Sequence, residues 1–320
     1  LEICITTDIE ATIKEEGEIV VSAKLFLDIV RRLPEEIVFI ETDERMVTYI
    51  ACGKVNYQIV GMSSVEYPDL PSFEQTDRIT LNAKILRDMI RQTVYAVSEN
   101  TAKPIYTGSL YEIEDGVFKI IAIDGYRMAI RSENVDSESK NRFVVPGKTQ
   151  HEVLKLLTDD EENTEIIIGQ RHITFKIKNY RIISRLIEGT FIEYKSAIPK
   201  ETKTEVVINT RTIIDAVERM SLLNNDRIQS PVRCIFSDDE IKLSCTSAVG
   251  RANDVISVPI IGESVEIGFN NRYLLDALKN ADTDEIKLIL NGSLTAMIVK
   301  PVKGDSYLSI VVPMRLANEN

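Results

Sequence analysis

Hydrophobic residues recur along this chain at helical and strand spacing, and the same order of patterns appears three times. One amphipathic helical pattern is found at residues 20–33, 145–157 and 267–281. A basic residue opens each copy, and Lys24, Lys148 and Arg272 follow one another at intervals of 124 residues. Equal spacing of one feature indicates a domain plan that is repeated three times.

Strand-like alternation flanks every copy, at residues 1–13, 118–130 and 241–256 before the helix and 36–61, 165–187 and 285–314 after it. A second helical pattern heads two copies only, at 79–98 and 206–223, where Lys84 and Arg211 lie 127 residues apart. Extending that interval backwards places its first counterpart before Leu1. We therefore expect the first domain to lack its opening helix and the adjacent strands, so that the true N-terminus is missing.

The fold class predicted is α+β, with domains at 1–76, 77–203 and 204–320. A chain of 320 residues exceeds the size of one growing core. Polar segments with nearby proline mark the boundaries, at 69–77 and 199–204. No run of 18 apolar residues is present, and Cys4, Cys52, Cys234 and Cys245 stand singly, which indicates reduced thiols in a cytoplasmic protein.

Charge is distributed unevenly. The chain carries a net charge of −12, yet the five helical patterns hold more basic than acidic residues. In residues 81–98, Lys84, Arg87 and Arg91 lie opposite the apolar side. An ordinary solvated helix face is the better explanation for one such helix, whereas recurrence of the basic bias in four of the five helical patterns makes contact with phosphates an equally good explanation. Because no aromatic platform or base-reading motif accompanies the basic residues, contact with DNA would be to its backbone.

Catalytic motifs are missing from the sequence. His151 lies in a helical pattern and His172 in a strand-like run, and both are interpreted as structural. There is no glycine-rich phosphate loop, nucleophile elbow or metal-spaced Cys/His cluster. We expect no enzyme and no cofactor.

Several motifs resemble those of bacterial DNA polymerase III β sliding clamps over the whole chain. They are IAIDGYRMAI at 121–130, GTFIEY at 189–194, GFNNRY at 268–273 and the terminal PMRL at 313–316. The resemblance implies a head-to-tail homodimer that encircles duplex DNA, with helices lining the inner face and antiparallel sheets outside. The lining residues expected by position are Lys24, Arg31, Arg32, Lys84, Arg87, Arg91, Lys103, Lys148, Arg211 and Arg272.

The resemblance also implies a groove for short linear peptides that carry Gln and Leu/Phe anchors. Its walls would be Tyr106, Ile123, Gly125, Tyr126, Arg127, Met128, Ala197, Asn270, Tyr273, Leu294, Ile310, Val312, Pro313, Met314, Arg315 and Leu316. From the residues alone, the strand positions among them are better explained as core and Asp124-Gly125 as a plain turn. Two features depart from the family: Ile192 replaces a proline, and residues 317–320 extend beyond the usual terminal leucine.

The resemblance places a dimer seam at Tyr57 and Ile59 in the first domain and at Leu222 and Leu223 in the third. The expected partners are double-stranded DNA, a second copy, the polymerase III catalytic subunit, the clamp loader and other clamp-binding proteins. The alternative is a three-domain interaction scaffold that never encloses DNA, with its basic helices simply solvated.

Overall fold

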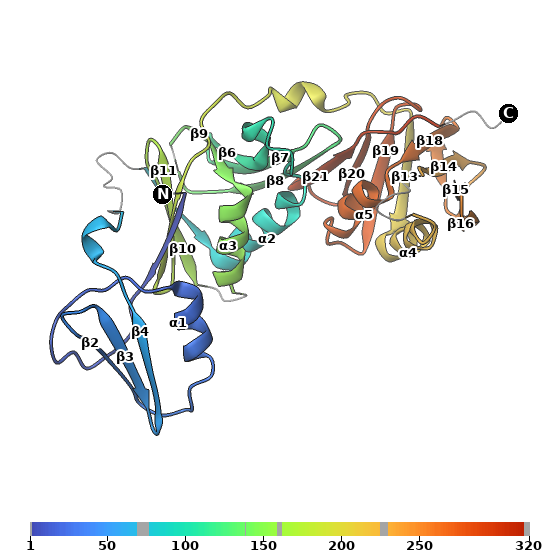
Figure 1. The fold of residues 1–320 in the computed structure, drawn as a ribbon. Coiled ribbons are helices and arrows are strands. Elements are labelled where there is room, and N and C mark those ends of the chain that lie inside the picture. The colour runs from blue at the N-terminus through green and yellow to red at the C-terminus, as the bar shows by residue number, and fades with distance from the viewer. Residues whose placement is uncertain (1, 69–76, 138, 159–161, 225–229, 317–320) are drawn as a thin grey trace. The chain divides into compact units, whose positions relative to one another are not determined.

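The computed structural model describes residues 2–68, 77–137, 139–158, 162–224 and 230–316. They form helices and antiparallel sheets in two compact units, one of residues 8–72 and one that combines residues 1–7 with 73–320 (Figure 1). The expected 76/77 boundary and the 317–320 extension involve residues outside the described ranges.

The smaller unit contains one α-helix and a three-stranded antiparallel sheet in its described residues. Helix α1 (Ala23–Val30) begins after Ser22, whose hydroxyl accepts the Leu25 N–H. The sheet order is β2 (Val38–Thr42), β3 (Val47–Cys52) and β4 (Val55–Val60), and a short 3-10 helix follows at Ser64–Glu66. Ile29 of the helix packs against Ile50 and Ile59 of the sheet to form a small core.

A five-stranded antiparallel sheet of the larger unit includes the first strand of the chain. Its order is β1 (Ile3–Thr7), β12 (Tyr180–Arg185), β11 (His172–Ile177), β10 (Asn163–Ile168) and β5 (Asp77–Asn82). Ile3 is opposite Ser184. The segment before the smaller unit is thus part of a sheet made mostly of residues 77–185.

A nine-stranded sheet joins the second and third copies of the repeat. Its order is β17 (Ile260–Gly262), β13 (Thr204–Asn209), β19 (Glu285–Leu290), β20 (Met297–Pro301), β21 (Tyr307–Val311), β8 (Arg127–Asn134), β7 (Val117–Ile123), β6 (Gly108–Glu114) and β9 (Asn141–Pro146). The β21–β8 pair is the link, with Ile310 opposite Met128. Backbone hydrogen bonds therefore cross from one copy to the next.

A four-stranded sheet completes the larger unit, with the order β16 (Gly250–Ser257), β15 (Glu240–Ser247), β14 (Val232–Ser237) and β18 (Val265–Phe269). Short 3-10 helices lie at Pro104–Thr107 and Tyr194–Ala197.

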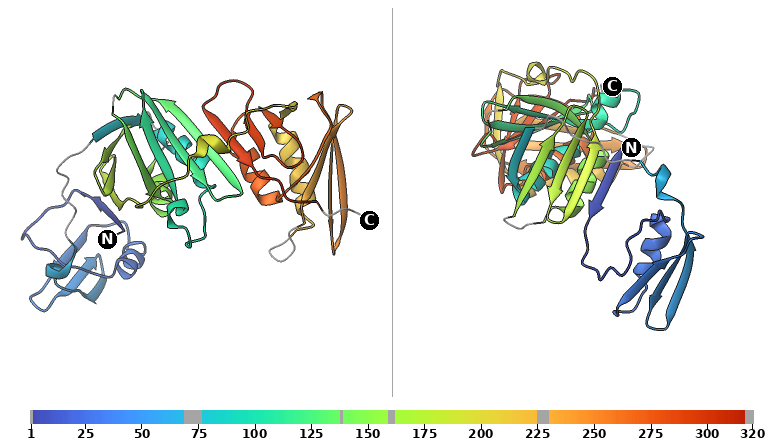
Figure 2. Two further views of the ribbon diagram at one scale, coloured as in Figure 1. Left: turned by 90° about the horizontal axis from the view of Figure 1, so that it is seen from above. Right: turned by 90° about the vertical axis from the view of Figure 1, so that its left-hand side faces the viewer.

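The helices of the larger unit pack in two pairs (Figures 1 and 2). These are α2 (Ala83–Val94) with α3 (Gly147–Leu156), and α4 (Thr210–Ser221) with α5 (Asn271–Lys279). Asparagine side chains at the N-caps of α2, α4 and α5 accept backbone N–H groups, which fixes where each helix begins. All five predicted helices are present, each shorter than its hydrophobic pattern.

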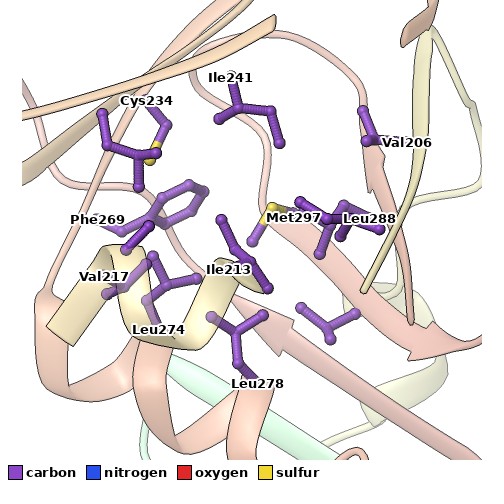
Figure 3. Close-up of a cluster of buried hydrophobic side chains, with 14 of the residues drawn as sticks. Val206, Ile213, Val217, Cys234, Ile241, Phe269, Leu274, Leu278, Leu288 and Met297 are labelled. Carbon is purple, nitrogen blue, oxygen red and sulfur yellow. The ribbon is translucent and has the colours of Figure 1, made fainter. Parts of the chain in front are cut away.

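Apolar sides of helices and sheets meet in the cores. In the core of residues 206–311, Ile213 and Val217 of α4 and Leu274 and Leu278 of α5 face Phe269 and its neighbours from the sheets (Figure 3). A separate core contains α2 and the five-stranded sheet. The alternation read from the sequence therefore predicted these strands because their inner side chains are buried.

Candidate functional site

A tight turn between β7 and β8 is where the second copy of the repeat meets the third. The Asp124 Oδ1 atom accepts the backbone N–H groups of Tyr126 and Arg127 at 2.8 and 3.0 Å. Gly125 has φ +95°, in the region that favours glycine. This turn fixes the adjacent directions of the Tyr126 and Arg127 side chains.

Arg127 is a buried cation, 6% exposed, held from both copies. Its Nε donates to Asp124 Oδ2 at 2.9 Å, and its Nη1 donates to the carboxylate of Asp276 in α5. The guanidinium carbon lies 4.6 Å from the ring centre of Tyr273 and 5.5 Å from that of Tyr95. Two carboxylates and two aromatic faces offset the cost of removing this charge from water.

Tyr126 and Tyr273 form a stacked pair beside Arg127, with ring centres 5.8 Å apart and planes 18° apart. Tyr126 is 60% exposed, whereas Tyr273 is half-buried and burial raises the pKa of its hydroxyl. The Asn270 side chain, three residues before Tyr273, caps α5. We call this pair the tyrosine shelf.

The C-terminal residues 312–316 cross from this turn to β18. The Val312 N–H donates to the Tyr126 carbonyl at 2.9 Å, and the Met314 N–H donates to the Gly268 carbonyl at 2.8 Å. A Cβ on Gly268 would come within 2.6 Å of Leu316, so glycine is what leaves room for that side chain. The segment is thereby fixed to both copies of the repeat.

The structure sorts the predicted peptide-binding residues into two neighbouring groups. Tyr126, Arg127 and Tyr273 lie together at the turn, joined by the 312–316 segment. A cluster around Met128 and Ile310, both buried, includes Tyr106 and Ile123 at its edge. Leu294 and Ala197 are exposed and belong to neither group, and Arg315, within the 312–316 segment, is exposed as well. Within the two groups, Tyr126 and Val312 are large apolar residues that remain exposed.

Three residues that contact Arg127 were not identified from the sequence. They are Asp124 and Asp276, which form ion pairs with it, and Tyr95, whose ring lies against its guanidinium. Asp124 belongs to the Asp-Gly-x-Arg motif, which offered a signal. Asp276 and Tyr95 are single polar residues within helical patterns, and helical spacing does not reveal a contact between distant helices.

A cation is the second residue of each α-helix: Lys24 in α1, Lys84 in α2, Lys148 in α3, Arg211 in α4 and Arg272 in α5. All five side chains are exposed, and no first turn contains an acidic residue. Helix dipoles favour anions at this end, so each cation opposes the local electrostatic preference by about 0.3–1 kcal/mol. An exposed cation at a helix start attracts phosphate through its charge.

The other predicted DNA-binding residues differ in availability. Arg31, Arg32 and Lys103 are exposed, whereas Arg87 and Arg91 are half-buried. Arg91 forms an ion pair with Asp282, which connects α2 to the turn after α5. Arg91 therefore connects two copies of the repeat in addition to being a partly exposed cation.

Several cations at helix starts also pair weakly with carboxylates. Arg211 lies 2.8 Å from Asp215, and Arg272 lies 3.4 Å from Glu99. Such exposed pairs are worth about 0–1 kcal/mol, so a phosphate can replace the carboxylate. In the described residues, Lys24 and Lys84 form no ion pair.

The predicted dimer-seam residues are divided between surface and core. Tyr57 is partly exposed on β4, an edge strand of its sheet among the described residues, and Leu222 is 83% exposed at the end of α4. Leu223 is half-buried near Gly250 of the edge strand β16. Ile59 instead lies in the small core, because its side chain faces α1.

The described residues hold no group of three or more His, Cys, Asp or Glu side chains placed to bind a metal ion. All four cysteines are unpaired. None of the described helices combines the length and apolar character needed to cross a membrane.

The fold and the site define a clamp protein of three repeated α+β domains. The family described as DNA polymerase III beta subunit matches through its N-terminal domain at residues 1–71, its central domain at 80–193 and its C-terminal domain at 195–315. The chain belongs to this family. Membership confirms the expected function in DNA replication as a beta sliding clamp, a non-catalytic processivity subunit.

Individual relatives agree with this assignment. The beta sliding clamps of Halalkalibacterium halodurans and Bacillus subtilis are 34% and 32% identical to the chain, over 95% of its length and 82% of theirs. Two similar crystal structures are the Bacillus subtilis DNA polymerase sliding clamp (TM-score 0.95, 32% identity, 99% of this chain and 87% of that one) and a putative DNA polymerase III beta subunit from Eubacterium rectale (0.94, 32%, 98% and 86%).

The expected loss of an opening helix receives no support from these comparisons. The N-terminal-domain model of the family matches residues 1–71. The α+β, three-domain clamp fold with antiparallel sheets is confirmed.

Proposed function

We propose that two copies of this chain join head to tail into a ring of six domains, with the helices lining the hole and the sheets outside. Duplex DNA would pass through the hole. Domains at 1–76, 77–203 and 204–320 would be the repeated units, in a cytoplasmic protein. Enclosure, rather than tight binding, would keep an attached polymerase on its template.

The observation that carries this proposal is the exposed cation at the second position of all five α-helices in the described residues. The helix dipole disfavours a cation at the start of a helix. The recurrence of this cation is therefore not explained by the stability of the individual helices. Contact with DNA phosphates supplies a reason, because it is electrostatic and independent of base sequence. Lys24, Lys84, Lys148, Arg211 and Arg272 would be the primary contacts. Arg31, Arg32, Arg87, Arg91 and Lys103 would add to them.

Two unpaired strand edges support the head-to-tail seam. Strand β4 ends the sheet of the smaller unit, and β16 ends the four-stranded sheet, among the described residues. Edge strands present free N–H and C=O groups that a second chain can pair with. Tyr57 on β4, with Leu222 and Leu223 near β16, would supply the apolar contacts.

The tyrosine shelf, Val312 and the apolar cluster around Met128 would bind short peptides with Gln and Leu/Phe anchors. Aromatic and aliphatic walls suit apolar anchors, and the peptide groups of 312–316 offer hydrogen bonds. The partners would be the polymerase III catalytic subunit, the clamp loader and other proteins with such segments.

Retention on nicked circular DNA tests the ring. We expect the loaded chain to stay on circles and to leave when the circle is cut, because a closed ring leaves only at a free end. Binding that is the same on circles and linear DNA would overturn enclosure and favour the interaction scaffold.

A charge-matched pair of variants tests the helix cations. One replaces the five second-position cations by Gln, and the other replaces five exposed lysines elsewhere, Lys54, Lys140, Lys200, Lys242 and Lys303, by Gln. Each change removes five charges. Only the first set should reduce the salt dependence of DNA binding, by up to about 0.9 in log–log slope for each lost phosphate contact. Equal effects would indicate a general charge effect.

A further inference from the structure

We infer that Asp276, which belongs to α5 and was not assigned to the peptide groove, is a positioning residue for that groove. It holds Arg127 across the junction of two repeat copies and so sets the tyrosine shelf. The inference rests on the proposed peptide-binding function and identifies what keeps its most exposed wall in place.

The two carboxylates that contact Arg127 come from different copies of the repeat. Asp124 is three residues away in the same turn, so its bond to Nε keeps the arginine within its own copy. Asp276 belongs to the other copy, and its carboxylate accepts a hydrogen bond from Arg127 Nη1. The bond to Asp276 is therefore the one that draws the guanidinium toward α5.

Tyr273 lies about one helical turn before Asp276 on α5, and therefore on the same side of the helix. Drawing Arg127 toward Asp276 also holds its guanidinium 4.6 Å from the Tyr273 ring centre. Tyr126 then stacks on the Tyr273 ring and, through its carbonyl, receives the Val312 N–H. The groove wall is thus connected to a carboxylate that does not itself form the shelf.

Removing the negative charge of Asp276 changes the balance of charges around Arg127. Asp276→Asn keeps the size of the side chain but leaves the buried guanidinium with one carboxylate, Asp124. Arg127 then gains by turning toward Asp124 or toward water, because an unpaired buried charge is costly. Either movement withdraws the cation from Tyr273 and loosens the stack with Tyr126.

A second ion pair between the same copies provides a matched control. Asp282 pairs with Arg91 of α2, so Asp282→Asn also removes one carboxylate from the junction. Among the described residues, no hydrogen bond or cation–π contact joins that pair to either tyrosine of the shelf. The two variants differ in whether the lost carboxylate supports Arg127.

The experiment measures binding of a fluorescein-labelled hexapeptide, with Gln first and Leu-Phe last, to the full chain by anisotropy. We expect Asp276→Asn to weaken binding about tenfold, equivalent to about 1.4 kcal/mol, and Asp282→Asn to change it less than twofold. A double-mutant cycle with Tyr126→Ala should show that Asp276→Asn loses most of its effect once the shelf is gone.

A spectroscopic readout separates positioning from general stability. The chain contains no tryptophan, so Tyr126→Trp introduces a single reporter on the shelf. We expect Asp276→Asn to change its emission in the folded protein, whereas Asp282→Asn leaves it unchanged.

Unchanged affinity in Asp276→Asn, with wild-type binding intact, overturns the positioning role alone. Equal losses in both variants attribute the effect to a loosened junction and overturn it as well. A wild-type chain that does not bind the hexapeptide overturns the proposed peptide groove, and this inference with it.

Discussion

Strands β2 and β19 occupy equivalent places in two copies of the repeat, yet they differ in burial. Ile286 and Leu288 of β19 are 0% and 1% exposed, whereas Phe39 and Ile40 of β2 are 60% and 55% exposed. β19 lies between β13 and β20, while β2 has β3 on one side and, among the described residues, no strand on the other. The same apolar pattern therefore yields a core strand only where neighbours cover it.

The helices show the same contrast. α5 packs against α4, and Lys279 of α5 pairs with Glu218 of α4 at 2.6 Å. In the described part of residues 8–72, α1 is the single α-helix, and Leu25 and Leu27 are about half exposed. An open hollow of about 470 Å³ beside Ile37 and Cys52 belongs to this unit. Apolar sequence is a condition for a large core, but covering elements determine its size.

The largest expected difference comes from one substitution made in both regions. Phe269→Ala should cost about 3–5 kcal/mol, because Phe269 is fully buried in its core. Phe39→Ala should change stability by at most about 0.5 kcal/mol, because its ring already contacts water. The stability changes of the two variants are measured by urea unfolding, with the hydrogen exchange of amides in each region as the probe. Equal losses would mean that β2 is covered in solution.

Ile50→Ala sharpens the comparison within the smaller unit. Because the Ile50 side chain is buried, we expect the substitution to lower the free energy of unfolding by about 2–5 kcal/mol. Because residues 8–72 form their own compact unit, we expect rapid exchange of their amides while those of 77–316 remain protected. Ile50→Val should cost only about 0.5–1.5 kcal/mol. Loss of protection throughout the chain would contradict independent unfolding.

Tyr95→Phe tests a hydroxyl network found in the larger unit. The Tyr95 hydroxyl lies 3.0 Å from that of Tyr307 and 2.8 Å from that of Ser309. Removing it leaves buried hydroxyl groups without that partner, so a cost of about 1–3 kcal/mol is expected. Denaturant unfolding measures it, and an unchanged midpoint would contradict the role of the network.

Burial of the Tyr95 hydroxyl predicts sensitivity to alkaline pH. Burial raises the pKa of Tyr95 from 10.0 to about 12. Between these values the unfolded chain releases this proton and the folded chain keeps it, so stability is complete below pH 10 and falls as pH rises toward 12. The expected slope from this residue is about 1.4 kcal/mol per pH unit. Tyr95→Phe should remove this contribution in pH-dependent unfolding.

The smallest effect is expected from Ile37→Ser, since Ile37 is mostly exposed in the smaller unit. Stability should change by no more than about 0.5 kcal/mol. Light scattering should show reduced self-association, because exposed apolar groups promote it. A loss above 2 kcal/mol would show that Ile37 is covered.

Sequence reasoning identified the repeated helices and strands because period and spacing are local properties of the chain. Lys24, Lys148 and Arg272 marked equivalent helix starts correctly for that reason. The Asp-Gly-x-Arg motif also located the turn at Gly125, where a positive φ favours glycine.

Contacts between distant segments were decided by tertiary structure alone. The ion pair between Arg127 and Asp276, the stack of Tyr126 on Tyr273 and the burial of Ile59 join residues whose separation no periodic pattern records. A hydrophobic pattern specifies which side of an element avoids water. Packing in three dimensions specifies what covers that side, and therefore which residues of the same type become core and which remain available to bind.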